Sequence, residues 1–140
     1  MSQMVMLLVE DNPADVLFFQ EALEAAGLPA RLEVVDNGED AMHFVLRRGR
    51  WAQAPRPDVI VLDLNVPMRN GQEVLVDLAG DTDLNSIPVA VLTTSTSETC
   101  VTELYPPGRC LYFVKTADFR RLQEIVRKIA AHAAPAAAGK

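Results

Sequence analysis

The stretch Met4-Val-Met-Leu-Leu-Val9 is a short apolar run that ends abruptly at two acids, Glu10 and Asp11. A second run of the same kind, Val59-Ile-Val-Leu62, also ends at an acid, Asp63. Short runs that are apolar at nearly every position are typical of strands buried on both faces of a parallel sheet. Parallel neighbours place their carboxyl ends at one edge of the sheet, so we expect these three carboxylates to meet there.

Three carboxylates at one edge of a sheet call for a cation. Like charges at short range raise one another's pKa values unless a positive ion neutralises them. Ligands that are all oxygen favour a hard metal such as Mg2+ over zinc. We therefore expect Mg2+ at Glu10, Asp11 and Asp63, beside an exposed and reactive Asp63.

The rest of the chain alternates short apolar runs with stretches whose apolar residues recur at helical spacing. Asn12 and Pro13 predict the start of a helix that ends at Gly27, with Asp15 on the side that faces water. Further strands are predicted at 31–35, 88–92 and 111–114, and further helices from Gly38 to Gly49, after Gly71, at 97–104 and at 119–131. This alternation predicts an α/β fold, a doubly wound five-stranded parallel sheet with helices on both faces.

Composition argues against several classes of protein. The net charge of -6 opposes a phosphate backbone, so we expect no nucleic-acid partner. No apolar stretch reaches the length of a membrane span, and the run from Met4 lacks the basic start of a signal peptide. We expect a cytoplasmic protein with no membrane partner and with reduced cysteines at Cys100 and Cys110. Its single domain should span residues 4–131, followed by a mobile, alanine-rich tail at 132–140.

The ends of the strands suggest a reaction. An Asp can attack a phosphoryl group when a metal screens the repulsion between the two anions. Asp63 is the candidate nucleophile because it ends the middle strand, and Glu10 and Asp11 flank it as metal ligands. Thr93 and Lys115, each at the end of its own strand, offer a hydroxyl and a cation to the oxygens of the product.

The same residues belong to a wider pattern that covers roughly residues 4 to 131. Its motifs are Val9-Glu10-Asp11-Asn12, Asp63-Leu64-Asn65-Val66-Pro67, Asn70-Gly71, Pro88-Val-Ala-Val-Leu-Thr93 and Tyr112-Phe113-Val114-Lys115. In this order and spacing they resemble the receiver domain of bacterial response regulators, the CheY-like family. The resemblance implies a flavodoxin-like sheet with strand order 2-1-3-4-5.

The resemblance also implies a signalling role in a two-component phosphorelay. Asp63 would take a phosphoryl group from a histidine kinase. Mg2+ would be bound by Glu10, Asp11 and Asp63 together with the backbone carbonyl of Asn65. Such a protein is a phosphoacceptor and not an enzyme, beyond phosphorylating and dephosphorylating itself.

A change of surface is the implied output. Thr93 and Lys115 would bind the phosphoryl group, and movement of Thr93 would leave space into which the ring of Tyr112 turns. The fourth helix, fifth strand and fifth helix would then contact a downstream target, a histidine phosphotransfer protein or a second copy in a homodimer. A phosphate sink, or an intermediate relay without an output of its own, is the alternative interpretation.

Finer motifs resemble one branch of the family, the stand-alone receivers paired with phytochrome-type histidine kinases. These motifs are Leu46-Arg47-Arg48-Gly49-Arg50, Ala54-Pro55-Arg56-Pro57-Asp58 and Leu92-Thr93-Thr94-Ser95-Thr96-Ser97. The kinase partner implied by this branch is a bacteriophytochrome.

Two departures from the family pattern stand out. Thr116 follows Lys115 where the family usually has Pro, so we expect a trans peptide bond there and a changed placement of Lys115. Pro106 and Pro107 stand where the fourth helix would usually finish, and prolines cannot continue a helix. We therefore expect a shorter and differently shaped signalling face.

Simpler interpretations and other functions remain open at this stage. Glu10 and Asp11 also suit the N-terminal end of a helix dipole. A haloacid dehalogenase-type aspartyl-phosphate hydrolase would need a second Asp two residues after the nucleophile, where Asn65 stands. A flavin or nucleotide carrier would need a phosphate-binding loop after the first strand, where this chain is acidic. The arginines around Trp51 suit a solvated loop, with kinase docking as the alternative.

Overall fold

The computed structural model describes residues 3–94 and 102–133, and its centre is a five-stranded parallel sheet. The strands are β1 (Met4–Val9), β2 (Ala30–Val35), β3 (Val59–Leu62), β4 (Val89–Thr93) and β5 (Cys110–Val114). They lie in the order β2-β1-β3-β4-β5, and every neighbouring pair is parallel. The predicted sheet and its order are confirmed.

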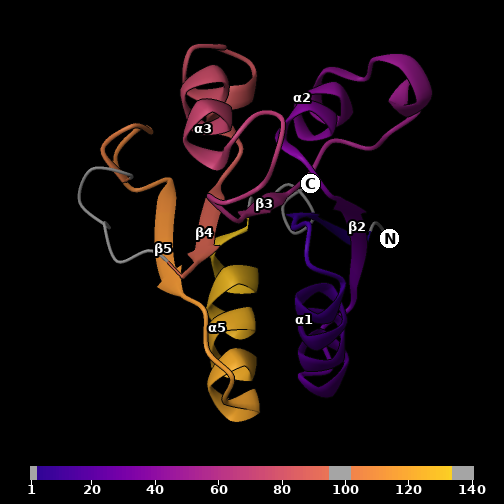
Figure 1. Cartoon of the computed structure of the whole chain (residues 1–140), viewed down its shortest axis with the longest axis vertical. Coiled ribbons are helices and arrows are strands. Elements are labelled where there is room, and N and C mark those ends of the chain that lie inside the picture. Colours follow the sequence, from indigo (N-terminus) through magenta and orange to yellow (C-terminus); the bar gives the residue numbers. More distant parts are fainter. Residues whose placement is uncertain (1–2, 95–101, 134–140) are drawn as a thin grey trace.

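Helices cover both faces of the sheet, as Figure 1 shows. On one face lie α1 (Pro13–Ala25) and α5 (Phe119–His132), and on the other α2 (Gly38–Leu46) and α3 (Gly71–Ala79). Two short 3-10 helices, η1 (Gly49–Trp51) and η2 (Leu84–Ser86), belong to the connections before β3 and β4. Side chains alternate along each strand, so the sheet separates two apolar cores, one under α2 and α3 and one under α1 and α5.

The helices begin where side chains supply caps. The side chain of Asn12 accepts a hydrogen bond from the Ala14 N–H, and Pro13 occupies the first helical position of α1. Asn70 and Glu73 form a reciprocal capping box at the start of α3. Asn70 therefore has a structural role at the start of this helix.

Helix α2 is shorter than predicted. It was expected to reach Gly49 but ends at Leu46, because Arg47 adopts a left-handed conformation with φ 56°. The N–H groups of Arg47 and Arg48 then bond back to the carbonyls of Phe44 and His43, which closes the last turn. Helical spacing of apolar residues does not report such a local reversal of the backbone.

The predicted helix at 97–104 falls mostly outside the described residues, as does the alanine-rich tail from residue 134 on. Residues 103 and 104 form a turn that leads to Tyr105, whose ring is buried in the core under α2 and α3. The Tyr105 hydroxyl lies 2.7 Å from the Ile87 carbonyl oxygen and 3.2 Å from that of Leu84. It therefore ties the Pro106-Pro107 segment to η2 and to the start of β4. The shape of the signalling face stays a prediction.

Gly71, at the start of α3, packs directly against the backbone that follows β3. A Cβ atom at this position would lie 2.6 Å from the Leu64 Cα and 2.7 Å from the Asp63 carbonyl oxygen. The Gly71 N–H also donates to the Leu64 carbonyl at 3.1 Å. The absence of a side chain at Gly71 thus sets the path of the chain just beyond Asp63.

We expect Gly71→Ala to lower the free energy of unfolding by about 1–3 kcal/mol, because the methyl group would displace backbone and not a flexible side chain. Gly80→Ala is the matched control, since its Cβ would lie 3.5 Å from its nearest neighbour and its backbone is right-handed helical. Urea unfolding of the two variants compares them. Equal stability of Gly71→Ala and Gly80→Ala would contradict the packing argument.

We expect Tyr105→Phe to lower the free energy of unfolding by about 1–3 kcal/mol, because it removes a donor from buried carbonyl groups and keeps the ring. Val76→Ala is the control: Val76 is half exposed on α3, and its truncation should change stability by about 0.5 kcal/mol or less. Unfolding in urea at neutral pH measures both.

Tyr105→Phe should also change how the free energy of unfolding depends on pH. Burial raises the pKa of Tyr105 to about 12 from 10.0. The folded protein therefore binds this proton more tightly than the unfolded chain, so the stabilisation is complete below about pH 10 and is lost as the pH approaches 12. We expect the difference in stability between the wild type and Tyr105→Phe to narrow between neutral pH and about pH 11. A constant difference would contradict this assignment.

Candidate functional site

The backbone ladder of the sheet extends one residue beyond three strands and so fixes where their polar residues begin. The N–H of Glu10 donates to the Val35 carbonyl at 3.0 Å. The N–H of Asp63 donates to Val9 at 3.1 Å, and that of Lys115 to Thr93 at 2.8 Å. Each of these residues is therefore anchored by the neighbouring strand, and its side chain projects from the C-terminal edge of the sheet.

Glu10, Asp11 and Asp63 form an acidic cluster. Each offers one carboxylate oxygen, and these oxygens all lie within 4.8 Å of one another. Carboxylate oxygens gathered this closely from two strands could together bind one small divalent cation. The donor set is all oxygen and doubly or triply anionic, which fits a hard divalent cation. The meeting of these three carboxylates was predicted from the sequence.

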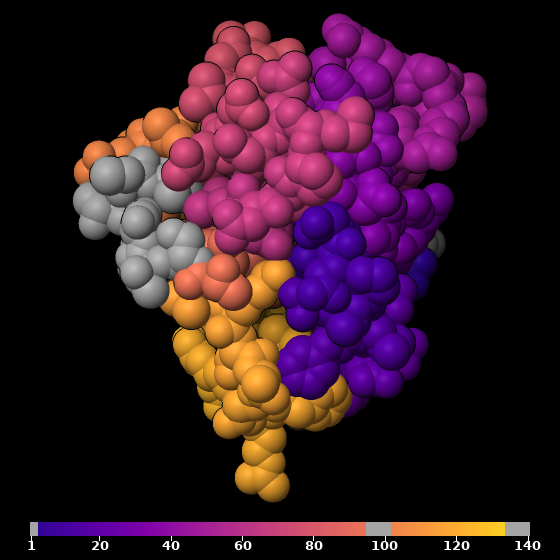
Figure 2. All heavy atoms as spheres, viewed as in Figure 1, coloured from indigo at the N-terminus to yellow at the C-terminus, as the bar shows by residue number. Residues whose placement is uncertain are grey.

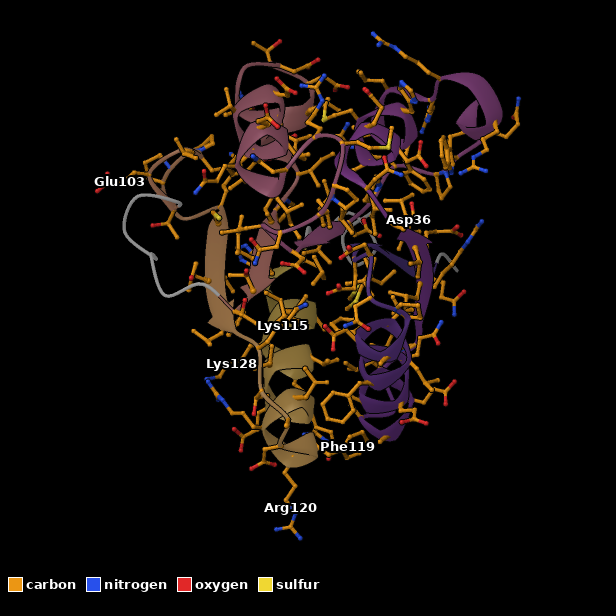
Figure 3. The ribbon with its side chains drawn as sticks, in the orientation of Figure 1. Asp36, Glu103, Lys115, Phe119, Arg120 and Lys128 are labelled. Atoms are coloured by element: carbon orange, nitrogen blue, oxygen red, sulfur yellow. The ribbon has the colours of Figure 1, made fainter. Side chains whose placement is uncertain are left out.

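Lys115 lies against the acidic cluster. Its ammonium Nζ is 2.7 Å from Glu10 Oε1 and 2.9 Å from Asp63 Oδ2. It is also 2.7 Å from Asp15 Oδ2, at the start of α1. Figure 3 shows Lys115 at the end of β5, between that strand and α1. The peptide bonds of the described residues are all trans, as expected for Lys115–Thr116, and Lys115 still reaches Asp63.

The expectation of an exposed Asp63 is wrong for this arrangement. Only 5% of its side chain is accessible, and Glu10 is buried to the same degree at 4%. The Lys115 ammonium lies against the Asp63 carboxylate at 2.9 Å, and the Lys115 side chain is itself only 19% accessible. Lys115 is therefore one of the groups that cover Asp63.

Burial and hydrogen bonding shift the pKa values of Glu10 and Lys115 in opposite directions. Burial raises the pKa of Glu10, and the hydrogen bonds from Lys115 and the Asn12 N–H offset this only in part. Burial by itself would lower the pKa of Lys115, but its hydrogen bonds to Asp15, Glu10 and Asp63 more than reverse this, so its pKa is raised. Lys115 is therefore a permanent cation at neutral pH.

Asp15 was expected to face water, and it does so only in part. It is partly buried, with 39% of its side chain accessible, and it pairs with Lys115. Apolar periodicity could not reveal this role, because its partner lies 100 residues away along the chain.

The remaining predicted residues lie around the acidic cluster. The Asn65 N–H donates to Asp63 Oδ1 at 3.0 Å, and its side-chain amide lies 3.4 Å from Thr94 Oγ1. Thr93 ends β4 and is fully buried. Tyr112 lies on β5 opposite Val91 and packs against the core under α2 and α3. By the alternation of side chains, Thr93 is on the same face of β4 as Val91, so Thr93 and Tyr112 share one face.

The surface of the site combines segments far apart in the sequence. Figure 2 shows the start of α1, the segment after β3 and the segment after β5 meeting on one face of the molecule. The arginines near Trp51 lie elsewhere: Arg50 pairs with Asp40 at 3.2 Å and stacks over the Trp51 ring at 4.2 Å. None of the helices in the described part of the chain is long and apolar enough to cross a bilayer.

Comparison with known proteins agrees with this geometry. A model of the response regulator receiver domain matches residues 6–127. Response regulator Rcp1 of Synechocystis sp. is 38% identical over 125 residues, which cover 89% of this chain and 85% of that protein.

Solved structures show the same similarity. The crystal structure of the phosphorylated cyanobacterial phytochrome response regulator RcpA matches with a TM-score of 0.80 and 39% identity, over 91% of each chain. The Mn(2+)-bound form of response regulator Rcp1 matches with a TM-score of 0.79 and 37% identity, over 91% of this chain and 92% of that one. The chain therefore belongs to the response regulator receiver family, the phosphoacceptor domains of two-component signalling.

Proposed function

We propose that this chain accepts a phosphoryl group on Asp63 from a histidine kinase, in a reaction that depends on Mg2+. One observation carries the proposal: three carboxylate oxygens from Glu10, Asp11 and Asp63 lie within 4.8 Å of one another, and the Lys115 ammonium is 2.9 Å from Asp63. The structure of Rcp1 with Mn(2+) supports a divalent ion at such a site.

The proposed reaction is a direct phosphoryl transfer. An oxygen of the Asp63 carboxylate attacks phosphorus, the nitrogen–phosphorus bond of the phosphohistidine breaks, and the imidazole keeps the electron pair. Mg2+ bound by Glu10, Asp11, Asp63 and the carbonyl of Asn65 would screen the repulsion between the two anions. The product is an acyl phosphate on Asp63.

Residues around Asp63 can stabilise the negative charge that the phosphoryl group brings. The Lys115 ammonium can move from the carboxylate to a phosphoryl oxygen, a short displacement for a long side chain. The Asn65 N–H already donates to Asp63 Oδ1 and holds the carboxylate in place. The Thr93 hydroxyl, at the end of the adjacent strand, is the proposed further donor. Self-dephosphorylation would follow when water attacks the same phosphorus.

The proposed switch connects Thr93 to Tyr112. Movement of Thr93 toward the phosphoryl group would open space on the face of the sheet where the Tyr112 ring also lies. Because Tyr112 is only partly buried, its ring can take an inner or an outer position at modest cost in packing. The surface around β5 would then differ between the two states and bind its partner differently.

The proposed kinase is of the phytochrome type. Support comes from the similarity to the cyanobacterial phytochrome response regulator RcpA, which covers 91% of both chains. The downstream partner would be a protein target, a histidine phosphotransfer protein or a second copy of the chain. If the protein signals, phosphorylation should change the binding of a partner at the β5 surface. If it is only a phosphate sink, phosphorylation should leave that binding unchanged. The expected cytoplasmic location and the domain limits at 4–131 stay predictions.

We expect Asp63→Asn to abolish labelling by acetyl phosphate and Mg2+, because an amide oxygen is too weak a nucleophile to form the acyl phosphate. The matched control is Asp36→Asn. Asp36 follows β2 at the same edge of the sheet, but it lies away from Lys115 (Figure 3) and outside the acidic cluster. Intact-mass spectrometry measures the gain of one phosphoryl group, and circular dichroism checks the fold. Labelling of Asp63→Asn equal to that of Asp36→Asn would rule out Asp63 as the acceptor.

We expect labelling of Asp63 to be lost in excess chelator and restored by Mg2+ or Mn2+. Without a metal ion the three carboxylates would repel an incoming phosphoryl donor, and among the described residues Lys115 is the cation close enough to Asp63 to oppose that repulsion. Replacing Glu10 by Gln should raise the Mg2+ concentration needed for half-maximal labelling. Labelling that is equally fast in chelator would show that the acidic cluster works without a metal.

A further inference from the structure

The Lys115 ammonium is shared among three carboxylates that differ in burial. Glu10 and Asp63 are 4% and 5% accessible and lie on the inner side of the ammonium. Asp15 is 39% accessible and approaches from α1, so it is the outer partner. Its Oδ2 atom is 2.7 Å from Nζ, as close as the oxygen of Glu10.

Capping of α1 does not explain the position of Asp15. The Asn12 side chain accepts the hydrogen bond from the Ala14 N–H at 2.9 Å. In a capping box, an acid at the third helical position accepts a hydrogen bond from the N–H of the capping residue. Here the Asn12 N–H donates instead to Glu10 Oε2, at 3.1 Å. Asp15 occupies that third position, and its carboxylate is directed to Lys115.

The surroundings of Lys115 strengthen this ion pair. A small cavity beside its side chain is lined by Phe18, Phe19, Leu92 and Leu122 together with Asp15 and Glu10. Apolar walls exclude water from one side of the ion pair and so reduce its screening. Phe18 packs on Phe119 with ring centroids 5.7 Å apart, which ties α1 to the start of α5 beside this cavity.

We propose that Asp15 is a positioning residue that holds the Lys115 ammonium beside Asp63 while Asp63 takes up a phosphoryl group. The inference rests on the proposed function. In that reaction Glu10 turns to the metal, and one oxygen of Asp63 becomes bonded to phosphorus. Asp15 has neither task, so it is the fixed anchor about which Lys115 moves from the carboxylate to a phosphoryl oxygen. The reaction is otherwise unchanged, with the same bonds made and broken.

The rate of phosphoryl transfer should therefore depend on Asp15, although Asp15 contacts neither the metal nor the phosphorus in the proposed reaction. With Asp15 replaced, Lys115 would remain charged but would distribute over more rotamers. Fewer molecules would then present the ammonium to the phosphoryl oxygens when the donor arrives. A glutamate, one methylene longer, can still reach the ammonium, whereas an asparagine keeps a hydrogen bond at best and loses the charge.

The first test measures whether Asp15 holds Lys115 and needs no phosphorylation. The chain has three lysines, so NMR of protein labelled with 13C at the lysine ε carbon resolves Lys115 with little overlap. Its signal is assigned by its loss in Lys115→Met, and exposed Lys128 is the internal reference. We expect the Lys115 signal to move toward that of Lys128 in Asp15→Asn and to stay near its wild-type position in Asp15→Glu. An unmoved signal in Asp15→Asn would overturn the proposal.

The second test measures labelling by acetyl phosphate at saturating Mg2+. We expect Asp15→Asn to label about tenfold more slowly than the wild type and Asp15→Glu to recover most of the rate. Glu24→Gln, an exposed charge change on the same helix, should leave the rate unaltered. In a Lys115→Met background, Asp15→Asn should cause no further slowing, because Asp15 acts through Lys115.

The outcomes separate this inference from the proposed function. A wild-type rate in Asp15→Asn, or an equal slowing by Asp15→Asn with and without Lys115, would overturn the role of Asp15 and leave Asp63 as the acceptor. If neither the wild type nor Asp63→Asn is labelled, the proposed function fails, and the NMR signal of Lys115 still decides whether Asp15 anchors it.

Discussion

The organisation of this molecule depends on one electrostatic constraint: negative side chains that the sheet brings together must be neutralised. The sheet anchors Glu10 and Asp63 through backbone hydrogen bonds to adjacent strands, so these residues cannot separate to relieve repulsion. The Lys115 ammonium, from a third strand, pairs with both carboxylates. Its three close carboxylate contacts outweigh the cost of its own burial. Fixed acids and one movable cation give a site that can exchange partners without a change of fold.

The sequence predicted most of the fold and the acidic cluster, for physical reasons. Strands apolar at nearly every position, such as Val59–Leu62, are typical of the centre of a parallel sheet, and parallel strands collect their terminal residues at one edge. That argument located Glu10, Asp11, Asp63, Thr93 and Lys115 without coordinates. The end of α2 was not predicted correctly from the sequence, because Arg47 reverses the backbone in a way that composition does not signal.

The sequence predicted that the acidic residues would lie together, but it did not predict how deeply Asp63 is buried. Whether Asp63 is exposed depends on where the Lys115 side chain lies, and that depends on contacts between residues far apart in the chain. The same contacts make Asp15 part of the site. Periodicity placed Asp15 on the polar side of α1, which is correct for its helix face. Periodicity could not show that this face borders the edge of the sheet where Lys115 ends its strand.

The separation of the interior into two cores has a consequence for how such a domain diversifies. Residues under α2 and α3 share few neighbours with those under α1 and α5, because the sheet lies between them. Substitutions in the two layers should then combine additively. One layer can accumulate changes that alter recognition on its outer surface while the opposite layer keeps its ancestral packing. Chimeras that exchange one helical layer between distant homologues are therefore a natural route to engineered receivers.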